Sequence, residues 1–277
     1  MTKPFSLAFR ITNLTGCVSS QLASSRFIMA SQALGGNAVT PSTSRLRCWF
    51  ESLTLGMGIP AMIWILSKFI TSSIPAAVSG SPEQRFFFWF IAGVIAEWLF
   101  VIGVWFLLKN RGLSFNDLGV WRVGTWSAWV LALALAALSI LSNLRLFPRM
   151  HIPISNAFLP HGFHLLAALI LGVTAGFCEE VLFRGFLMTQ FAKAGYGRAI
   201  QVLVPGLAFG LAHAGYLNQG FLVWLGIVLP TAFLGMMWGV AYLLGRRSLL
   251  PTIVAHFLND ATALPWIVFF MMTNPHG

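Results

Sequence analysis

The chain has 277 residues, of which 57% are hydrophobic and 9% charged, and its formal net charge is +10. Water-soluble domains carry roughly a quarter charged residues, so this composition excludes an ordinary soluble domain and indicates a polytopic membrane protein. The mean hydropathy of +0.80 agrees. The length suits one bundle of helices without a separate soluble domain. The basic excess fits loops that flank apolar segments and meet anionic lipid head groups, so we do not expect nucleic acid as a partner.

Residues 1–48 contain no acidic residue, five basic residues and many serines. This bias is compatible with a disordered cytoplasmic tail, with an organelle transit peptide, or with a start codon assigned too far upstream. Of these we prefer the tail. The predicted organisation is therefore a basic, Ser-rich N-terminal tail over 1–48 and a transmembrane helical domain over 49–277.

Seven apolar segments follow, and together they predict an all-α membrane helix bundle. They lie at about 50–70, 86–108, 126–141, 163–192, 199–214, 221–244 and 250–272. The third and fifth are short for a full span, and charged residues interrupt the fourth. An eighth span or a re-entrant piece could lie in 142–162, but Arg145, Pro148 and Pro153 favour a loop there.

Loop charges predict the orientation of the bundle. With the N-terminus inside, the inner loops hold nine basic residues and the outer loops four, which favours an inner N-terminus and an outer C-terminus. The inner set is Arg45, Arg47, Lys109, Arg111, Arg122, Lys193, Arg198, Arg246 and Arg247, and the outer set is Lys68, Arg85, Arg145 and Arg149. We expect a multi-pass integral protein of a bacterial inner membrane with a cytoplasmic N-terminus.

Two of the seven acidic residues, Glu179 and Glu180, stand side by side inside the fourth apolar segment. A charge at bilayer depth costs at least ~2.5–3.5 kcal/mol on insertion scales, so a functional role is the default interpretation. On an α-helix Arg184 faces the same side as Glu180 and can pair with it. Glu179 lies about 100° round the helix and is predicted to point elsewhere. A structural ion pair would explain Glu180 and Arg184 but leaves Glu179 without a purpose.

The second polar position is His213. A single histidine on an apolar helix is more often a packed core residue than a catalyst, but the position of this one favours a site. Glu179 lies seventeen residues before Tyr196, which is in a turn, and His213 lies seventeen after it. In an antiparallel hairpin both would lie ~25 Å from the turn, level with one another. Glycine pairs at 172/176 and 206/210 would let these two helices approach closely.

The third polar position is His256-Phe-Leu-Asn259-Asp260, in which His256 and Asp260 share one helical face. Read alone, Asp260 is an acid at a helix end paired with His256. A fourth intramembrane acid, Glu97, lies in the middle of the second segment. No residue nearby in sequence pairs with it, so we interpret it as a protonated carboxyl satisfied by a neighbouring helix, rather than as part of the site.

These groups together suggest hydrolysis. A carboxylate and a histidine at one depth can hold a water and remove its proton, and a second histidine with an amide can stabilise an oxyanion. Alternatively, Glu179, His213 and His256 could bind Zn²⁺ and activate its water. The chain contains neither a His-Glu-x-x-His run nor a Gly-x-Ser-x-Gly elbow. The three cysteines, at 17, 48 and 178, give no disulfide framework and no zinc-ribbon spacing.

The order of the three motifs resembles a known family. Glu179-Glu180-x-x-x-Arg184, then Phe209-x-x-x-His213, then the His256 motif, each on its own membrane helix, is similar to the CPBP intramembrane proteases. These include type II CAAX prenyl endopeptidases and bacteriocin-processing or immunity relatives. The resemblance covers about residues 163–265, which would form the catalytic core, whereas the N-terminal half matches only as generic membrane helices.

The resemblance implies peptide-bond hydrolysis by an activated water. It assigns the positioning and deprotonation of the water to Glu179 and His213, and stabilisation of the oxyanion to His256 with the residue four places later. Glu180 and Arg184 would be a supporting pair. We expect a metal-free glutamate mechanism without a cofactor, with Zn²⁺ as the alternative.

The chain departs from the family pattern at that fourth place, because it carries Asp260 where Asn is common. An ionised aspartate would repel an oxyanion. Three explanations stay open: Asp260 is protonated, Asp260 orients His256, or Asn259 donates instead.

The expected substrate is a membrane-embedded or lipidated peptide or protein, and prenylated CAAX-type peptides are one candidate class. The sequence leaves open which membrane face admits it. Two other functions would use the same residues. One is a non-catalytic bacteriocin-immunity or scaffold protein that keeps the polar core for binding. The other is a proton-coupled transporter in which Glu97, Glu179 and Asp260 relay protons, although no internal repeat is visible.

Overall fold

The computed structural model describes residues 41–75, 79–158, 162–214 and 220–273, and within these ranges all regular structure is helical. The elements are α2 (Pro41–Ser73), α4 (Pro82–Lys109), α5 (Trp126–Leu144), α6 (Ser155–Phe158), α7 (Phe163–Thr174), η1 (Ala175–Leu187), α8 (Met188–Lys193), α9 (Arg198–Leu211), α10 (Phe221–Leu244), α11 (Leu250–Thr262) and α12 (Leu264–Thr273). Each of the seven predicted apolar segments is helical, so the all-α prediction is confirmed.

The chain separates into a unit of residues 1–44 and a compact unit of residues 45–277. Of the first unit only 41–44 are described, as the first turn of α2, so the predicted tail over 1–40 lies outside the described residues. Residues 41–48, which we expected in the tail, are helical instead. Proline suits the first turn of a helix, where its missing N–H would have no partner. Cys48 is buried and donates from Sγ to the Gln190 carbonyl at 3.4 Å, which holds α2 against α8 at this position.

Five helices are long and apolar enough to cross a membrane, and a sixth span results if the bent pair α11 and α12 is counted as one. The helix from Phe163 to Lys193 is one such span, and it contains α7, η1 and α8. The predicted total of seven or eight is not confirmed, because α9 has only 14 residues. The third segment reaches Leu144 and is therefore a full-length span. Between Leu144 and Phe163 the described residues form a loop with only the short α6.

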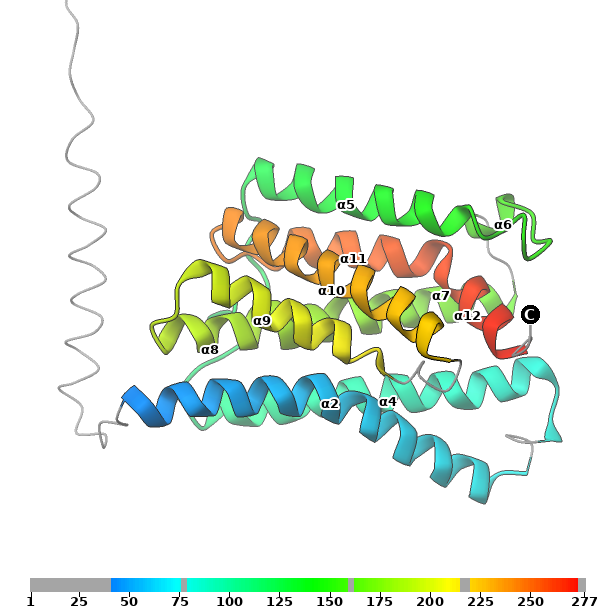
Figure 1. The fold of residues 1–277 in the computed structure, drawn as a ribbon, viewed down its shortest axis with the longest axis horizontal. Coiled ribbons are helices and arrows are strands. Elements are labelled where there is room, and N and C mark those ends of the chain that lie inside the picture. Colours follow the sequence, from blue (N-terminus) through cyan, green and yellow to red (C-terminus); the bar gives the residue numbers. More distant parts are fainter. Residues whose placement is uncertain (1–40, 76–78, 159–161, 215–219, 274–277) are drawn as a thin grey trace, which may run out of the picture. The chain divides into compact units, whose positions relative to one another are not determined.

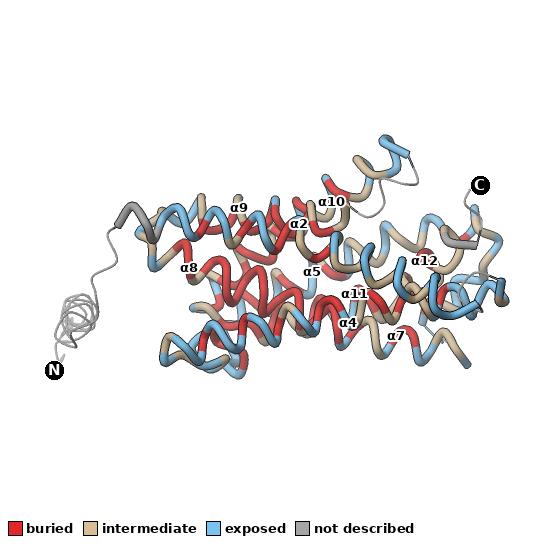
Figure 2. The backbone as a smooth tube through the Cα atoms, turned by 90° about the horizontal axis from the view of Figure 1, so that it is seen from below, coloured by how far each residue is buried: buried red, intermediate tan, exposed pale blue. Residues whose placement is uncertain are grey.

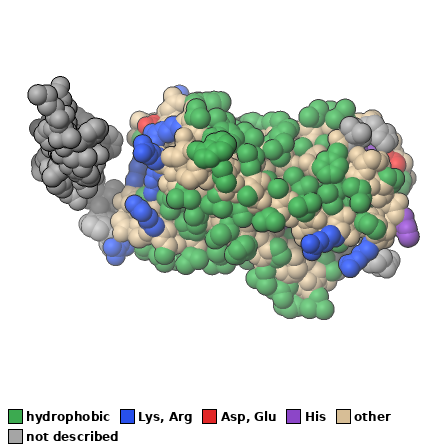
Figure 3. Space-filling view, turned by 90° about the horizontal axis from the view of Figure 1, so that it is seen from above, with side chains coloured by type: hydrophobic (Ala, Val, Ile, Leu, Met, Phe, Trp, Pro, Cys, Tyr) green, Lys and Arg blue, Asp and Glu red, His purple; other side chains and the backbone are tan. Residues whose placement is uncertain are grey.

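The outer surface is apolar, as a protein in lipid requires. Many large hydrophobic side chains are exposed, and several are more than 60% exposed: Trp64, Phe69, Leu138 and Leu222. Soluble monomers rarely expose wide apolar patches of this kind. Figure 3 shows hydrophobic side chains over most of the visible face, while Lys and Arg lie near the two ends, with more of them at one end than at the other. The chain is therefore a multi-pass integral membrane protein.

The segment that carries Glu179, Glu180 and Arg184 lies at the centre of the bundle. The helix η1 contacts α4, α7, α8, α9 and α11, and every η1 residue except Phe177 is buried. Outside it, α10 runs along α9 and α5, and α11 runs along α5 and α7 (Figure 1). Figure 2 shows this buried interior enclosed by helices whose outer faces are exposed. Helix α2 contains Pro60, and it bends midway, as an internal proline requires (Figure 1).

The glycine pairs bring helices together, but not the two that we predicted. A Cβ on Gly176 would lie 2.9 Å from the Phe257 amide nitrogen, and one on Gly172 would meet the Phe257 ring, so this pair admits α11. The 206/210 pair faces α10, where added Cβ atoms would meet Met236 and Ala232. The expected approach of the fourth segment to the fifth through these glycines is therefore wrong. A small-residue face permits close packing but does not select the partner helix.

Candidate active site

The acidic motif lies on a π-helix rather than on the α-helix that its sequence suggests. At the end of η1 the amide of Met188 donates to the carbonyl of Phe183, five residues earlier. Such i→i+5 segments are rare and occur frequently at functional sites. More residues per turn bring successive side chains closer together around the axis, so Glu179 and Glu180 reach the same partner. This corrects the prediction that Glu179 points elsewhere.

Glu180 and Arg184 form the expected ion pair, with Oε1 2.9 Å from Nη1 and both side chains at most 1% exposed. The guanidinium lies over the Phe209 ring, 4.2 Å from its centroid, and 5.6 Å from that of Trp238. Gly235 leaves room for it, because a Cβ there would lie 3.2 Å from Arg184 Nη2. An arginine stacked between aromatic rings keeps its charge while it is shielded from lipid.

His256 joins the acidic motif to α11. Its Nδ1 lies 2.9 Å from Glu180 Oε1, the same oxygen that pairs with Arg184. Its Nε2 lies 3.4 Å from Glu179 Oε2 and 3.4 Å from Asp260 Oδ2. An imidazole with carboxylate oxygens at both nitrogens can donate to both only in its protonated form. One ring thus links three acids that come from two helices.

The sequence also predicted a role for Asn259, and the structure gives its amide another partner. Asn259 Nδ2 donates to Asp260 Oδ1 at 2.7 Å, and Asn259 Oδ1 is buried without a hydrogen-bond partner in the described part of the chain. The amide that we considered as an oxyanion donor is therefore engaged with its neighbour. Asp260 uses one carboxylate oxygen for this amide and places the other beside His256 Nε2.

His213 lies just beyond α9, which ends at Leu211 and not at 214 as predicted. Its Nδ1 is 3.0 Å from the Phe209 carbonyl, and its ring meets Phe209 edge-on at 5.3 Å. The Phe209 ring also contacts the His256 ring, with the two centroids 5.9 Å apart. Within the described residues no hydrogen bond or ion pair joins His213 to Glu179, but the two interact electrostatically.

Sequence reasoning missed two groups around this cluster. Trp238 of α10 lies 4.5 Å from the His256 ring and is fully buried, and nothing in the sequence separated it from the other ten tryptophans. Glu97 of α4 is also buried, and it interacts electrostatically with Glu179, Asp260 and His256. The sequence already showed Glu97 as an acidic residue inside an apolar segment, but we interpreted it as a residue outside the site.

The fit to a metal can be tested on the arrangement of these side chains. Zinc requires three convergent protein ligands with Zn–N distances of about 2.0–2.1 Å. In the part of the chain that the structure describes, no three His, Cys, Asp or Glu side chains are grouped to hold a metal ion. Both nitrogens of His256 face carboxylate oxygens at ion-pair distances instead. The arrangement does not fit the alternative zinc set of Glu179, His213 and His256.

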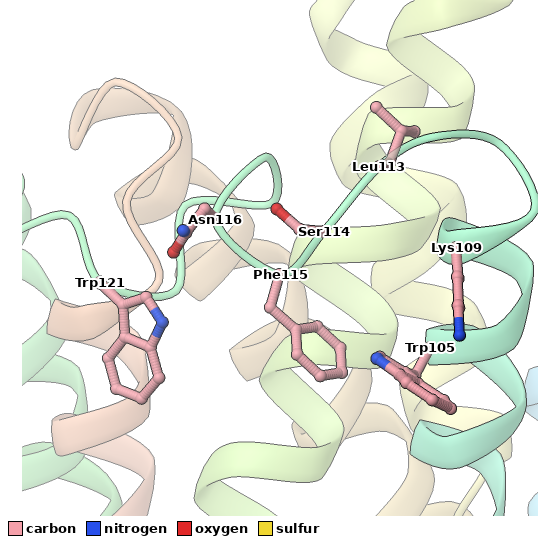
Figure 4. A pocket seen from close by; sticks show the side chains of 7 residues that line it. All are labelled: Trp105, Lys109, Leu113, Ser114, Phe115, Asn116 and Trp121. Carbon is pink, nitrogen blue, oxygen red and sulfur yellow. The ribbon is translucent and has the colours of Figure 1, made fainter.

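A separate pocket of about 270 Å³ lies at the end of α4 where the basic residues gather. It is lined by Trp105, Lys109, Leu113, Ser114, Phe115, Asn116 and Trp121 (Figure 4). Figure 4 shows the Phe115 ring pointing from the loop toward the helices. Phe115 contacts the Phe177 ring at 6.3 Å, and Phe177 precedes Glu179 by two residues. The loop that lines this pocket therefore packs against η1 two residues before Glu179.

Comparison with known proteins agrees with the motifs. Residues 160–262 match the family described as type II CAAX prenyl endopeptidase Rce1-like. The matched stretch covers less than half of the chain, and it contains all three polar motifs, although not Glu97. No curated protein matches the chain, and neither does any solved structure.

Proposed function

We propose that this membrane protein is an intramembrane endopeptidase that hydrolyses a peptide bond with an activated water, and the match of residues 160–262 to the Rce1-like type II CAAX prenyl endopeptidase family supports this. The observation that carries the proposal is the convergence of Glu179 and Asp260 on one nitrogen of His256, inside a lipid-facing bundle. Ionisable side chains buried in a membrane protein cost free energy, so a functional role is the default interpretation. No observation favours the immunity protein or the transporter.

In the proposed reaction, a water bound between Glu179 and His213 attacks the carbonyl carbon of the substrate. Glu179 takes the proton as the new C–O bond forms, which is general-base catalysis and contributes typically ~10²–10⁴-fold. The electrons of the carbonyl move to its oxygen. The carbon–nitrogen bond then breaks, and the departing nitrogen takes up a proton to leave as an amine.

His256 would stabilise the oxyanion through Nε2. Its Nδ1 is already held by Glu180, which Arg184 holds in turn, so the ring cannot rotate freely. The Nε2 contacts are longer, at 3.4 Å, and this nitrogen faces Glu179. Of the explanations for Asp260, its place beside Nε2 supports the second, that it orients His256. A protonated imidazole aimed at the developing charge is the type of group that lowers such a barrier.

The substrate class follows from the site and the family. A cluster enclosed by lipid-facing helices is suited to a peptide that is itself in the membrane, and the family description supports lipid-modified CAAX-type peptides. The pocket at the basic end supports entry from that side, because Phe115 connects it with Phe177. Trp121→Ala, which removes an exposed wall of the pocket, is expected to raise KM more than it lowers kcat.

We propose that α9 lies at bilayer depth beside α10 and completes a set of seven membrane segments. The nine basic residues at the inner loop positions support a cytoplasmic N-terminus. A bacterial plasma membrane stays a prediction. Labelling of single introduced cysteines at positions 112 and 80 with an impermeant thiol reagent, in a background without the native cysteines, distinguishes the two orientations.

The experiment compares wild-type protein with Glu179→Gln and His213→Ala in phospholipid nanodiscs, using a membrane-tethered peptide and mass spectrometry of the products. Cleavage by the wild type and its loss by at least ~10²-fold in both variants are expected. Glu83→Gln, an exposed acid on α4, is the control and should cleave normally. Normal cleavage by Glu179→Gln would contradict the assigned base.

The metal-free form of the proposal has its own test. Cleavage should persist after dialysis against a strong chelator. Loss of activity on chelation, with recovery when Zn²⁺ alone is returned, would favour a zinc mechanism.

A further inference from the structure

Glu97 is a buried acid that the reaction described above does not use. It lies in the middle of α4 with only 9% of its surface exposed, although Ile95 and Leu99, two positions away on either side, are exposed. Its Oε2 is fully buried and has no hydrogen-bond partner among the described residues. A carboxyl at this depth without a satisfied oxygen is costly, which points to a functional use.

The packing of α4 places this carboxyl against the site. The next residue, Trp98, donates from Nε1 to Thr174 Oγ1 at 3.3 Å and stacks on Phe177 at 5.8 Å. These contacts hold α4 against the stretch of the chain that leads into Glu179. From the opposite helix, His256 and Asp260 of α11 interact electrostatically with Glu97, as Glu179 does from η1.

The charges of the cluster decide what Glu97 can contribute. Glu180 has Arg184 and His256 within 2.9 Å, and Asp260 receives the Asn259 amide. Glu97 has neither an ion-pair partner nor a hydrogen-bond donor among the described residues, and two other acids, Glu179 and Asp260, are among its electrostatic neighbours. Three carboxylates around one imidazole in a buried site repel each other.

The carboxyl that can most readily stay neutral is the one without a cation or a donor. That carboxyl is Glu97, and in its neutral form it carries a proton that it can give away.

We propose that Glu97 is the general acid that protonates the departing amine, a role that rests on the proposed peptidase function. Glu179 takes one proton from the attacking water. Glu97 gives its own proton to the nitrogen as the carbon–nitrogen bond breaks. After the products leave, the proton on Glu179 passes to the Glu97 carboxylate, and both acids return to their starting forms. Water and peptide are converted to acid and amine without any other reactant.

The experiment uses two substrates with the same membrane-tethered peptide, one with the scissile amide and one with an aryl ester in its place. An amine needs a proton to depart, whereas a phenolate departs without one. Glu97→Gln keeps the shape of the side chain and removes the proton. It should lower amide hydrolysis by at least ~10²-fold, as expected for a lost general acid, and change aryl ester hydrolysis by less than about 5-fold. Glu97→Asp keeps an acid and should recover part of the amide activity.

The controls separate this inference from the proposed function. Glu83→Gln, on the same helix but outside the site, should cleave both substrates like the wild type. Glu179→Gln should lose both, because both need the attacking water. Equal losses of amide and ester hydrolysis in Glu97→Gln would mean a structural role and would overturn the inference alone, as would unchanged amide hydrolysis. A wild-type protein that cleaves neither substrate would overturn the peptidase function together with this role.

Discussion

Removal of the buried cation is the most informative change to the stability of the bundle. Arg184→Met keeps a long apolar stem but takes away the guanidinium that pairs with Glu180 at 2.9 Å and lies over the Phe209 ring. The carboxylate stays behind in a site where its side chain is fully buried. Its other partner, His256, then has to balance Glu180 as well as two further acids.

The magnitude follows from burial. Removing one partner of a buried ion pair typically costs about 3–5 kcal/mol, because the remaining charge is neither solvated nor paired. The chain contains a matched control, since Arg47 and Glu51 are also four residues apart and 2.9 Å from each other. There the arginine side chain is 53% exposed to solvent, and Glu51 keeps a second partner, Arg111, at 2.9 Å. Arg47→Met should therefore cost no more than about 1 kcal/mol.

The assay is reversible unfolding of the purified protein in mixed micelles, followed by helical circular dichroism as the fraction of denaturing detergent rises. A second variant, Glu180→Gln with Arg184→Met, removes both charges and should recover part of the loss. Free energies of unfolding for Arg184→Met and Arg47→Met that lie within about 1 kcal/mol of each other would refute the cost assigned to the buried charge. A further loss of stability when Glu180 is removed in addition would refute it as well.

Three further outcomes follow from the structure. Gly176→Ala should push α11 away from η1 and lower both thermal stability and peptide cleavage. Gly93→Ala is the control and should raise helix stability slightly, because an added Cβ there meets nothing within 4 Å. Equal shifts in the melting temperatures of the two variants would contradict the packing described. Asp260→Asn keeps an oxygen that can accept from the imidazole, so its cleavage rate should stay within about 10-fold of the wild type. Asp260→Leu should lower the cleavage rate by ~10²-fold or more. Equal cleavage rates in the two variants would contradict the orienting role of Asp260. Outside the membrane segments, the amide and hydroxyl of Ser114 donate to Asp117 at 2.7 and 2.9 Å and lower the pKa of this carboxyl. Its stabilising effect is therefore present at neutral pH and lost as the pH falls through the lowered pKa, so the melting temperatures of wild type and Asp117→Asn should converge as the pH falls below that pKa.

The seven apolar segments could be predicted because each one is a local property of the chain. A run of apolar residues flanked by charges must be helical in lipid, where every backbone group needs an internal partner. For the same reason the acids of η1 and the histidine of α11 were recognisable as costly, and therefore as candidates for a site. The pairing of Glu180 with Arg184 needed only the four-residue spacing.

Other features depend on contacts between segments that are distant in sequence. The glycine pairs could not reveal that they face α11 and α10, because a small face fits any helix. Glu97 was left outside the site for a similar reason, since its neighbours come from η1 and α11. The π-helical turn, which brings Glu179 and Glu180 to one imidazole, departs from the spacing on which the sequence argument relied.

By itself, the sequence determined that the protein is a membrane bundle and which side chains are too costly to be there without a purpose, because both depend on transfer from water to lipid, residue by residue. Only the tertiary structure decided that Glu179, Glu180 and Asp260 meet at His256, with Glu97 near enough to interact with them, and that Asn259 is already engaged by Asp260. The reason is that the energy of a buried charge depends on which charges other helices place beside it.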